Sequence, residues 1–506
     1  MSKNPVLRLF KRNIKDNYAK LTTLSTEDNS RRRFIKNSAM ASIALSIPST
    51  FLSSCSEKVN INSPRIAIIG GGIAGLHAGH IFKKASVGFT IFEASERVGG
   101  RIFSIKNQLG ENLTTEMGGE FIDSNHEDML NLVKEYNLSL LDLELDLKKS
   151  GLIKDAYFFS GKHYSEKELT DEFSKFSRLI AEDIQKVVEE EDETLFNSFD
   201  SISISDYLRN KGMNGWIFDL LTNAYTSEFG LESSEQSSLN LLYMLNPNYT
   251  DGFKIFGDSD ERYKIIGGNS QLTDLMYEKL KNEIKLKYQL SKLSEKDGLY
   301  KLEFSNGEQF EFDYVILSIP FSVLRKIELN LELPEEKTKA IQELGYGTSS
   351  KVILGSESRT WRSKGFSGYL FSDIIQNGWD SSIGENNDLD AGSYTVFLGG
   401  NAGKVATTED IPKYGKAFAD VFDSSEKFLN EKSTVFNWSN SPNFLGGYSA
   451  YKVGQWSTIA GYEKESVNNL FFAGEHCSED FQGYMNGGAE TGRIAAEAIL
   501  EKIKSV

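Results

Sequence analysis

The feature that most constrains the fold is a glycine-rich turn near the start of the folded part of the chain. An apolar run ends in Gly70-x-Gly72-x-x-Gly75, and a segment with helical periodicity follows it. The first glycine permits a tight strand-to-helix turn, the second lets the backbone approach a pyrophosphate, and the third lets helix and strand pack closely. A phosphate there would meet unpaired N–H groups at the positive end of the helix dipole. A second apolar run ends in Glu93, an acid placed to accept hydrogen bonds from a ribose. The pattern predicts a Rossmann-like βαβ unit that binds a dinucleotide.

Size, charge and cysteine content exclude several other classes of protein. The chain has 506 residues, of which 39% are hydrophobic, enough for two or three domain-sized units. Its formal net charge of −16 argues against a nucleic-acid partner and is compatible with cationic substrates. The two cysteines, Cys55 and Cys477, are not expected to form a structural disulfide, and Cys477 is interpreted as a small packed residue. His77 and His80 are spaced like a metal pair, but no third ligand is evident near them, so we expect no metal site.

The segment after the second apolar run narrows the choice of dinucleotide. The sequence from Glu93 to Arg101, EASERVGGR, resembles the motif that wraps FAD in the FAD-dependent amine oxidase superfamily, which includes monoamine, polyamine and L-amino-acid oxidases. The resemblance continues in the Gly267-Gly268 pair, in YVILSIP (314–320) and in the C-terminal motifs LFFAGEH (470–476) and GYMNGGAETGR (483–493). These matches bracket nearly all of the chain from Arg65 onward.

The resemblance implies FAD as the cofactor, a small-molecule amine as the substrate and O₂ as the electron acceptor. Hydride would pass from the amine's α-carbon to the flavin, and the enzyme would release an imine or aldehyde and hydrogen peroxide. By their match to the family's motifs, the expected cofactor contacts are Gly70, Gly72, Ala74, Gly75, Glu93, Arg97, Gly100, Arg101, Gly118, Gly119, Glu120, Leu290, Gly474, Glu475, Tyr484 and Met485.

Three residues match positions that carry the family's chemistry. Lys351 opens a β-type run, and the family's lysine there holds a water against the flavin and assists reoxidation by O₂. Tyr448 and Tyr484 match two tyrosines that form an aromatic sandwich, whose ring faces favour an approaching amine nitrogen. Gly447 stands where monoamine oxidases carry the cysteine that bonds FAD, so we expect FAD to be held without a covalent bond.

The sequence narrows the class of substrate only in part. Amino-acid oxidases of the superfamily place an arginine in the loop that here carries Glu120 and Asp123. Two carboxylates would repel an α-carboxylate and could attract a second amine, which favours amines or polyamines over amino acids. Arg359 and Arg362 stay as candidate carboxylate ligands, so an L-amino-acid oxidase is an open alternative. An FAD-dependent desaturase and a non-oxidase envelope flavoprotein are the others.

The predicted fold is α/β, with a Rossmann-like FAD-binding domain interleaved with an α+β substrate domain and a helical insertion. The FAD-binding domain is expected in residues 64–145, 255–320 and 434–506, and the substrate domain in 146–254 and 321–433. The charged, glycine-poor stretch from about 150 to 251 reads as mostly helical. Strands are expected at Lys301–Phe304 and Phe310–Leu317, joined by Asn306-Gly307, and at Lys351–Leu354 and Tyr394–Leu398. On the final helix, we expect one buried face made of Ile494, Ala495, Ala498 and Ile499.

The first 55 residues read as an export leader with a lipobox. The sequence SRRRFIK (30–36) fits a twin-arginine signal, which would engage the export machinery for folded proteins. A moderately apolar stretch then ends in Leu52-Ser-Ser-Cys55, which is similar to the lipobox of bacterial lipoproteins. We therefore expect an exported protein of the bacterial cell envelope, on the periplasmic side, attached to a membrane by lipid on Cys55.

Overall fold

The computed structural model describes residues 64–107, 113–188, 190, 192–250, 252–384, 391–424, 428 and 432–505. The predicted leader, with its arginine pair and Cys55, lies outside these residues. Among the described residues, no helix combines the length and apolar character needed to cross a bilayer.

A five-stranded parallel sheet forms around the glycine-rich turn. Its strand order is β20-β13-β1-β2-β9. Buried parallel strands read as continuous apolar runs, as β1 does. Its strands are β1 (Ile66–Ile69), β2 (Thr90–Glu93), β9 (Ile284–Leu286), β13 (Tyr314–Leu317) and β20 (Leu470–Phe472). Helices α3 (Ile73–Lys84), α11 (Ser270–Leu280) and α18 (Met485–Lys504) cover it, with α3 in contact with both of the others. The predicted βαβ unit is thus formed by β1, α3 and β2.

A four-stranded sheet packs beside the first, in the order β12-β11-β10-β14. It contains β10 (Leu290–Lys296), β11 (Leu299–Phe304), β12 (Gln309–Phe312) and β14 (Glu328–Asn330). The hairpin predicted around Asn306-Gly307 joins β11 to β12. The run predicted as one strand, Phe310–Leu317, is instead divided between two sheets, since β12 ends at Phe312 and β13 begins at Tyr314. Strand β14 pairs with β10, so this part of the chain extends beyond the predicted boundary at 320.

A seven-stranded sheet forms the other half of the molecule, in the order β19-β15-β18-β17-β16-β6-β7. Strand β19 pairs with β15, so the substrate domain extends past its predicted end at 433. The two strands of this sheet that come first in the chain, at 153–159 and 162–164, lie in the stretch that the sequence predicted to be mostly helical. The strands are β6 (Ile153–Phe159), β7 (Lys162–Tyr164), β15 (Ser349–Ser356), β16 (Phe366–Ser372), β17 (Gln376–Asp380), β18 (Gly392–Gly399) and β19 (Thr434–Asn437). On one side the sheet packs against α14 (Thr360–Ser363), α15 (Gly400–Val405) and the amphipathic α16 (Ile411–Phe422).

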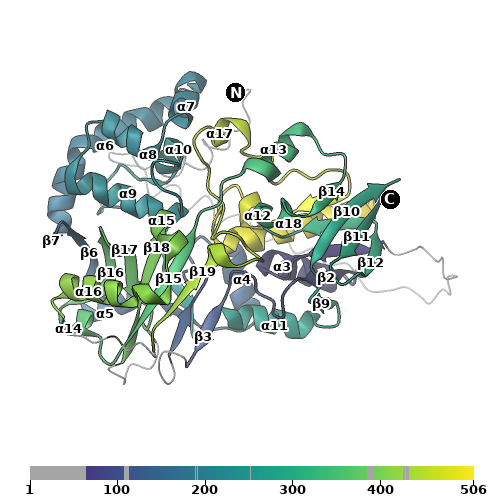
Figure 1. The fold of residues 1–506 in the computed structure, drawn as a ribbon, viewed down its shortest axis with the longest axis horizontal. Coiled ribbons are helices and arrows are strands. Elements are labelled where there is room, and N and C mark those ends of the chain that lie inside the picture. The colour runs from purple at the N-terminus through teal and green to yellow at the C-terminus, as the bar shows by residue number, and fades with distance from the viewer. Residues whose placement is uncertain are drawn as a thin grey trace, which may run out of the picture.

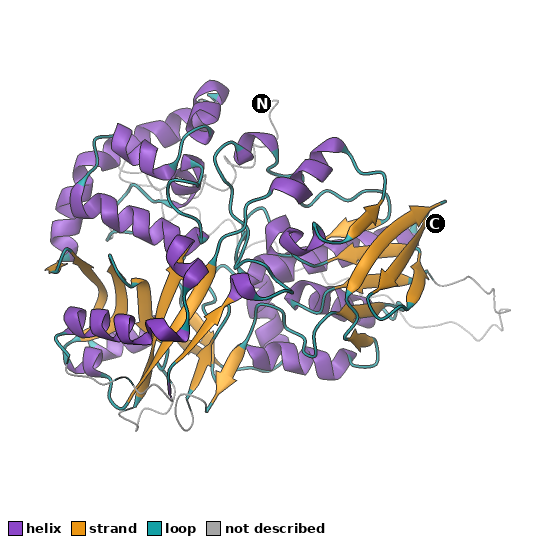
Figure 2. Cartoon of the chain, viewed as in Figure 1, coloured by secondary structure: helices purple, strands orange, loops and turns teal. Residues whose placement is uncertain are grey.

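The predicted helical insertion stands above this sheet (Figure 1). Its helices are α6 (Glu166–Val188), α7 (Glu193–Asp200), α8 (Ile204–Asn210), α9 (Gly215–Phe229) and α10 (Ser238–Met244). Helix α9 contacts β6, β16, β17 and β18, so it links the insertion to the sheet. Figure 2 shows the strands gathered in two groups on opposite sides of the molecule, with helices between and above them.

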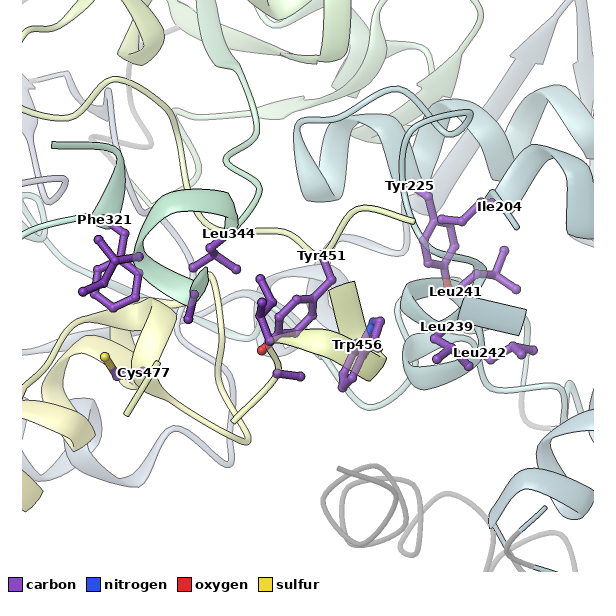
Figure 3. Packing of buried hydrophobic residues seen from close by; sticks show 14 of the residues in the cluster. Ile204, Tyr225, Leu239, Leu241, Leu242, Phe321, Leu344, Tyr451, Trp456 and Cys477 are labelled. Carbon is purple, nitrogen blue, oxygen red and sulfur yellow. The ribbon is translucent and has the colours of Figure 1, made fainter. Parts of the chain in front are cut away.

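Short elements connect these parts. The hairpin of β3 (Ser104–Lys106) and β4 (Thr114–Glu116) is followed by α4 (Glu127–Glu135), while β5 (Leu140–Asp142) pairs with β8 (Tyr263–Ile265) ahead of α5 (Leu143–Ser150). The remaining helices are α12 (Phe321–Leu324), α13 (Glu335–Glu343) and α17 (Gln455–Thr458). Figure 3 shows how buried side chains between them, including Phe321, Leu344, Tyr451 and Trp456, join the C-terminal segment to the helical insertion.

The buried face of α18 differs from the expected one. Ala495 and Ile499 are buried as expected, but Ile494 is 49% exposed. Gly492 and Ala496 are buried in place of Ile494. A Cβ on Gly492 would stand 2.1 Å from the carbonyl oxygen of Ala74, so the contact between α18 and α3 is a close backbone approach that selects glycine.

Candidate active site

A cavity of about 520 Å³ runs between the two halves of the molecule. Residues far apart in the sequence line it, from the glycine-rich turn at one end to Lys351, Tyr448 and Tyr484 at the other. A second cavity of about 410 Å³ adjoins it. Asp123, Phe229, Met244, Gln482 and Tyr484 line both cavities.

The glycine-rich turn forms one end of the first cavity. Gly70 adopts a φ of +113°, a conformation that favours glycine, and Gly72 precedes α3 without any side-chain cap on the helix. A Cβ on Gly72 would find its nearest neighbour 3.9 Å away, so this position borders open space. Ala74 also lines the cavity. Gly75 does not: a Cβ there would lie 2.0 Å from the oxygen of Gly70, so this glycine permits the close packing of helix on strand.

Glu93 closes this end of the cavity. Its carboxylate accepts hydrogen bonds from the backbone N–H groups of Gly71 (2.6 Å) and Ser95 (2.8 Å). These bonds fix the carboxylate beside the glycine-rich turn, where the sequence analysis places a ribose. Leu290, at the start of β10, also lines the cavity and is buried.

Arg97 and Arg101 have different places. Arg97 donates to the carbonyl oxygens of Val98 and Gly100 and stacks over Phe103, so it braces the loop from behind and lies outside the cavity lining. A direct cofactor contact from Arg97 is therefore not what the structure shows, whereas Gly100 and Arg101 do line the cavity.

Arg101 ties the N-terminal motif to the C-terminal one. Its guanidinium donates to Glu475 (2.9 Å) and to the carbonyl oxygen of Gly447 (2.6 Å). Glu475 also accepts from Ser449 and from the N–H of Gly483. Burial works to raise the pKa of Glu475, but Arg101 and the hydrogen bonds outweigh it, so the pKa is lowered and the carboxylate stays charged.

Close backbone approaches shape the middle of the cavity. A Cβ on Gly118 would stand 1.8 Å from the carbonyl oxygen of Arg101, and one on Gly119 would stand 2.7 Å from Met485, the first residue of α18. Gly474 has a φ of +128° at the end of β20. All four of these predicted contacts, Gly118, Gly119, Met485 and Gly474, line the cavity.

A buried lysine–glutamate–lysine group stands at the cavity wall, where its Glu120 and Lys351 line the cavity. Lys351, 3% exposed, donates to Glu120 Oε2 (2.8 Å) and to the carbonyl oxygen of Glu116 (3.0 Å). Lys264 donates to the other oxygen of Glu120 (2.9 Å) and to the carbonyl oxygen of Ser381. We call Lys264, Glu120 and Lys351 the lysine pair site. Burial raises the pKa of Glu120, but the two ammonium groups outweigh it and the pKa is lowered.

The lysine pair site contradicts the prediction made for Glu120, and it includes Lys264, which the sequence analysis did not predict. Glu120 was predicted to attract a second amine, but two ammonium groups of the protein already neutralise it. Lys264 was not predicted, because an alternating strand with one lysine carries no signal of burial. Glu116 lies beside the site, where burial raises its pKa to about 7.

The two predicted tyrosines line the cavity together with Lys351. The Tyr448 hydroxyl donates to the carbonyl oxygen of Ser227 (2.7 Å), and the Tyr484 hydroxyl donates to Glu228 (3.0 Å). Both hydroxyls point to the end of α9, so the helical insertion orients both rings. Gly447 lines the cavity next to Tyr448 and supplies no thiol. Trp379 adds its ring 5.1 Å from the Lys351 ammonium, and its buried Nε1 finds no partner among the described residues.

Carboxyl groups that the sequence analysis missed border the tyrosines. Glu228 and Glu261 line the cavity with Asp123. Burial raises the pKa of Glu228 to about 7, that of Glu261 to about 8 and that of Asp123 to about 6. One signal was available in the sequence for Glu228: an acid in the last turn of a helix opposes the helix dipole and is unfavourable for stability.

Several other candidates lie elsewhere. Arg359 donates to the carbonyl oxygen of Ala391, and Arg362 pairs with Asp146, so neither lines the cavity and both are wrong as carboxylate ligands there. Cys477 is buried and free, as expected for a packed residue. His77 bonds to the oxygen of Ala489 and His80 to Glu135, and the described residues hold no cluster suited to a metal.

The first cavity fits FAD. The N-terminus of α3 has no side-chain cap and lies at the glycine-rich turn, where its N–H groups could bind phosphate. Gly72 leaves room for a ligand to approach the backbone, and hydrogen bonds hold Glu93 beside the turn. The cavity continues past Arg101 and Gly119 to Lys351 and the tyrosines. A long ligand with a central pyrophosphate, an adenosine on one side and a reactive ring on the other matches this lining.

Comparisons with known proteins agree with this fit. A sequence model of the family described as flavin containing amine oxidoreductase matches residues 73–500. A flavin-containing amine oxidase of Oncorhynchus mykiss is 24% identical over 465 residues, which cover 87% of this chain and 86% of that protein. The flavin-containing amine oxidase A of Canis lupus familiaris shows the same identity and coverage.

Solved structures of the same fold give the same result. A cyclohexylamine oxidase from Brevibacterium oxydans superimposes with a TM-score of 0.74 at 18% identity, covering 87% of this chain and 100% of the other. A putrescine oxidase bound to putrescine superimposes with a TM-score of 0.72 at 18% identity, covering 87% of this chain and 99% of the other. These structures establish the fold.

Proposed function

The chain belongs to the family of flavin-containing amine oxidoreductases and is an FAD-dependent amine oxidase, and we propose that its first cavity carries out the reaction between Lys351 and the tyrosine pair. The overall reaction converts R–CH₂–NH₂, O₂ and H₂O into R–CHO, NH₃ and H₂O₂. The observation that carries the proposal is that Lys351, Tyr448 and Tyr484, which come from two halves of the molecule, line one cavity with the glycine-rich turn.

We infer that the glycine-rich turn and Glu93 hold the phosphates and ribose of FAD. Gly118, Gly119, Met485 and Leu290 border the rest of its length. Arg101 and Glu475 join the two motifs to each other by an ion pair. When bound, FAD supplies the two-electron acceptor that the protein's own side chains lack.

The protein's side chains position the amine and set the local charge. Tyr448 and Tyr484, each held by its hydroxyl, present ring faces that attract a nitrogen with partial positive charge. Lys351 is fixed by two hydrogen bonds and adds a positive charge to a water-poor wall. Such a preorganised charge stabilises negative charge that develops nearby, which is the role proposed for Lys351 in the reaction with O₂.

An amine and amino-acid panel tests the proposed function. We expect anaerobic addition of amines to bleach the flavin of the purified protein, and aerobic addition to release hydrogen peroxide. Among the described residues, Arg101 is the only arginine in the first cavity lining, and it is already paired with Glu475, so we expect amino acids to react poorly. Rapid bleaching by amino acids alone would favour the L-amino-acid oxidase, and no bleaching by any compound would favour a non-oxidase flavoprotein or a desaturase.

The bond between protein and FAD has its own test. Gly447 offers no thiol, and the buried Cys477 lies outside the first cavity lining, so acid precipitation should leave free FAD in the supernatant. Flavin retained in the pellet would show attachment through another residue.

We also propose that the protein is exported by the twin-arginine route and anchored by lipid on Cys55. The support is the sequence SRRRFIK (30–36) and the lipobox-like LSSC (52–55). Replacing Arg31 and Arg32 with lysine should leave a folded, FAD-containing precursor in the cytoplasm. Cys55→Ala should permit export but abolish labelling by radioactive fatty acid, because the acyl chains supply the membrane affinity. A wild-type protein that incorporates no lipid would refute the anchor while leaving the oxidase unaffected.

A further inference from the structure

The substrate end of the first cavity is acidic and continues into the second cavity. Asp123 lines both cavities, Glu228 and Glu261 line the first, and Glu463 lines the second. We call Asp123, Glu228, Glu261 and Glu463 the acidic wall. Tyr484, which lines both cavities, donates to Glu228, so the acidic wall borders the tyrosine that positions the amine.

Lysines lie near the acidic wall without pairing with its carboxyls: Lys337 donates to the backbone carbonyl oxygen of Glu463 (2.9 Å), and its charge opposes the rise in the pKa of that carboxyl. Among the described residues, none of its members forms an ion pair with a lysine or arginine side chain. Glu261 interacts with Lys154 without an ion pair, and it shares a hydrogen bond with Tyr369. Asp123 lies 3.5 Å from His126, whose pKa burial lowers to about 4, so this histidine is neutral near pH 7.

Glu463 is an independent observation at the second cavity. It is 2% exposed, and its Oε2 accepts from the N–H of Gly461. The hydroxyl of Tyr451 lies near this carboxyl, but Oε1 accepts no hydrogen bond of ordinary geometry. A buried carboxylate oxygen without a donor is costly, so its placement in a cavity wall suits a ligand that brings a positive N–H group.

The lysine pair site is a comparison for the acidic wall, because its carboxylate is neutralised by the protein's own lysines. Glu120 receives two ammonium groups in the same cavity that leaves Glu228 and Glu261 without one. Burial of an unpaired carboxyl is unfavourable, and the raised pKa values of Glu228 and Glu261 express that cost. A cationic ligand group would supply the missing counter-charge.

We propose that the acidic wall binds a second, protonated amino group of the substrate, so that the preferred substrates are diamines and longer polyamines. The inference rests on the proposed function, because the reacting amine must lie between the tyrosines. Only that amine loses hydride and becomes a carbonyl; the amino group at the acidic wall stays protonated throughout and takes no part in electron transfer. Short diamines would reach Asp123, Glu228 and Glu261, while longer polyamines would extend into the second cavity to Glu463.

The test compares diamines with monoamines of equal chain length. Steady-state kcat/KM and anaerobic flavin-reduction kinetics would be measured for each pair of compounds on wild-type protein. We expect kcat/KM to be about tenfold or more higher for the diamine, since one well-formed buried charge contact is worth at least that factor. Equal values for monoamine and diamine at every chain length would overturn the proposal without touching the oxidase assignment.

Conservative variants identify the residues responsible for the expected preference for diamines. Glu261→Gln and Asp123→Asn keep the side-chain shape and remove the charge, and we expect each to lower kcat/KM for the diamine about tenfold and for the monoamine less than about twofold. Glu463→Gln should affect only the longer polyamines. Glu336→Gln, an exposed acid on α13, is the matched control for loss of one negative charge. Equal losses for monoamine and diamine would show that the carboxyls only support the tyrosines, which overturns the proposal.

Two checks keep the result interpretable. FAD content and thermal midpoint would be measured for every variant, and the chain-length series on wild-type protein decides the question even if one variant does not fold. Absence of flavin bleaching by any amine in wild-type protein would instead count against the proposed function itself.

Discussion

The lysine pair site and the acidic wall contrast sharply in how the charges of their carboxyl groups are balanced. In the lysine pair site, Glu120 lies between the ammonium groups of Lys264 and Lys351 at 2.9 and 2.8 Å. In the acidic wall, the hydroxyl of Tyr484 is the only side-chain donor to Glu228 among the described residues. Glu120, Lys264 and Lys351 are buried, whereas Glu228 and Glu261 are half-buried in the cavity wall. Opposite charges hold the first region together, whereas the second keeps carboxyls that a cation has yet to balance.

The contrast teaches which part of the site is built for stability and which for a ligand. Breaking a buried ion pair is strongly unfavourable because it leaves an uncompensated charge. Removing a buried charge that has no partner takes away a desolvation cost instead. The same Glu→Gln substitution should therefore have opposite effects in the two regions.

The largest expected effect is that of Glu120→Gln. The variant leaves two buried ammonium groups facing a neutral amide, and loss of a buried charge partner costs about 3–5 kcal/mol. The thermal midpoint of the FAD-loaded protein should fall by several degrees, whereas Glu228→Gln should leave it unchanged or raise it. Differential scanning calorimetry of the two variants side by side checks this, and equal falls would remove the distinction between the regions.

Lys351→Met tests the chemical side of the lysine pair site. The variant removes the positive charge that lines the cavity and should slow reoxidation of reduced flavin by O₂ about a hundredfold, by analogy with the loss of a preorganised charge contact. Reduction by amine under anaerobic conditions should change much less. Stopped-flow oxidation of photoreduced enzyme gives the rate, and a wild-type value would return Lys351 to a purely structural role.

Lys264→Met should have a smaller effect on the same rate. Lys264 does not line the first cavity, so it acts on the flavin only through Glu120 and Lys351. We expect reoxidation to slow about tenfold, less than for Lys351→Met, because the cavity keeps its positive group but loses one of the bonds that fix Glu120. A loss as large as that of Lys351→Met would show direct contact with the reaction.

The smallest expected effect is a pH-dependent gain in stability for Glu261→Gln. An unfolded glutamate has a pKa of about 4.3, whereas burial raises the folded value to about 8, with Glu228 and Asp123 adding to the rise and Lys154 opposing it. The folded state then holds its proton more tightly, so wild-type stability falls as pH rises from about 4.3 through about 8. The variant lacks this loss and should melt at a higher temperature than the wild type at pH 9 but at the same temperature at pH 4.5. A higher melting temperature of the variant only at low pH would show that the pKa of Glu261 is not raised in the folded protein.

The sequence predicted the elements whose signals are local. The glycine-rich turn, the β11–β12 hairpin and the strands around Lys351 and Tyr394 appear where their patterns placed them. Predictions that depend on contacts with residues distant in the sequence were less accurate. Ile494 is exposed because Gly492 takes the contact with α3, and β14 and β19 join sheets whose other strands lie across predicted boundaries.

The sequence by itself determined the turn at Gly70, the acid at Glu93 and the absence of a thiol at Gly447, because backbone conformation and residue identity at these points depend on few neighbours. Only the tertiary structure decided the charge of the site. Glu120 finds Lys264 and Lys351 at separations of 144 and 231 residues, and no local pattern records such a pairing. Glu228 and Glu261 meet Asp123 in the same way, through the packing of a helix and two loops. Charge balance depends on distances in space, so it became readable only when the folded chain brought these side chains together.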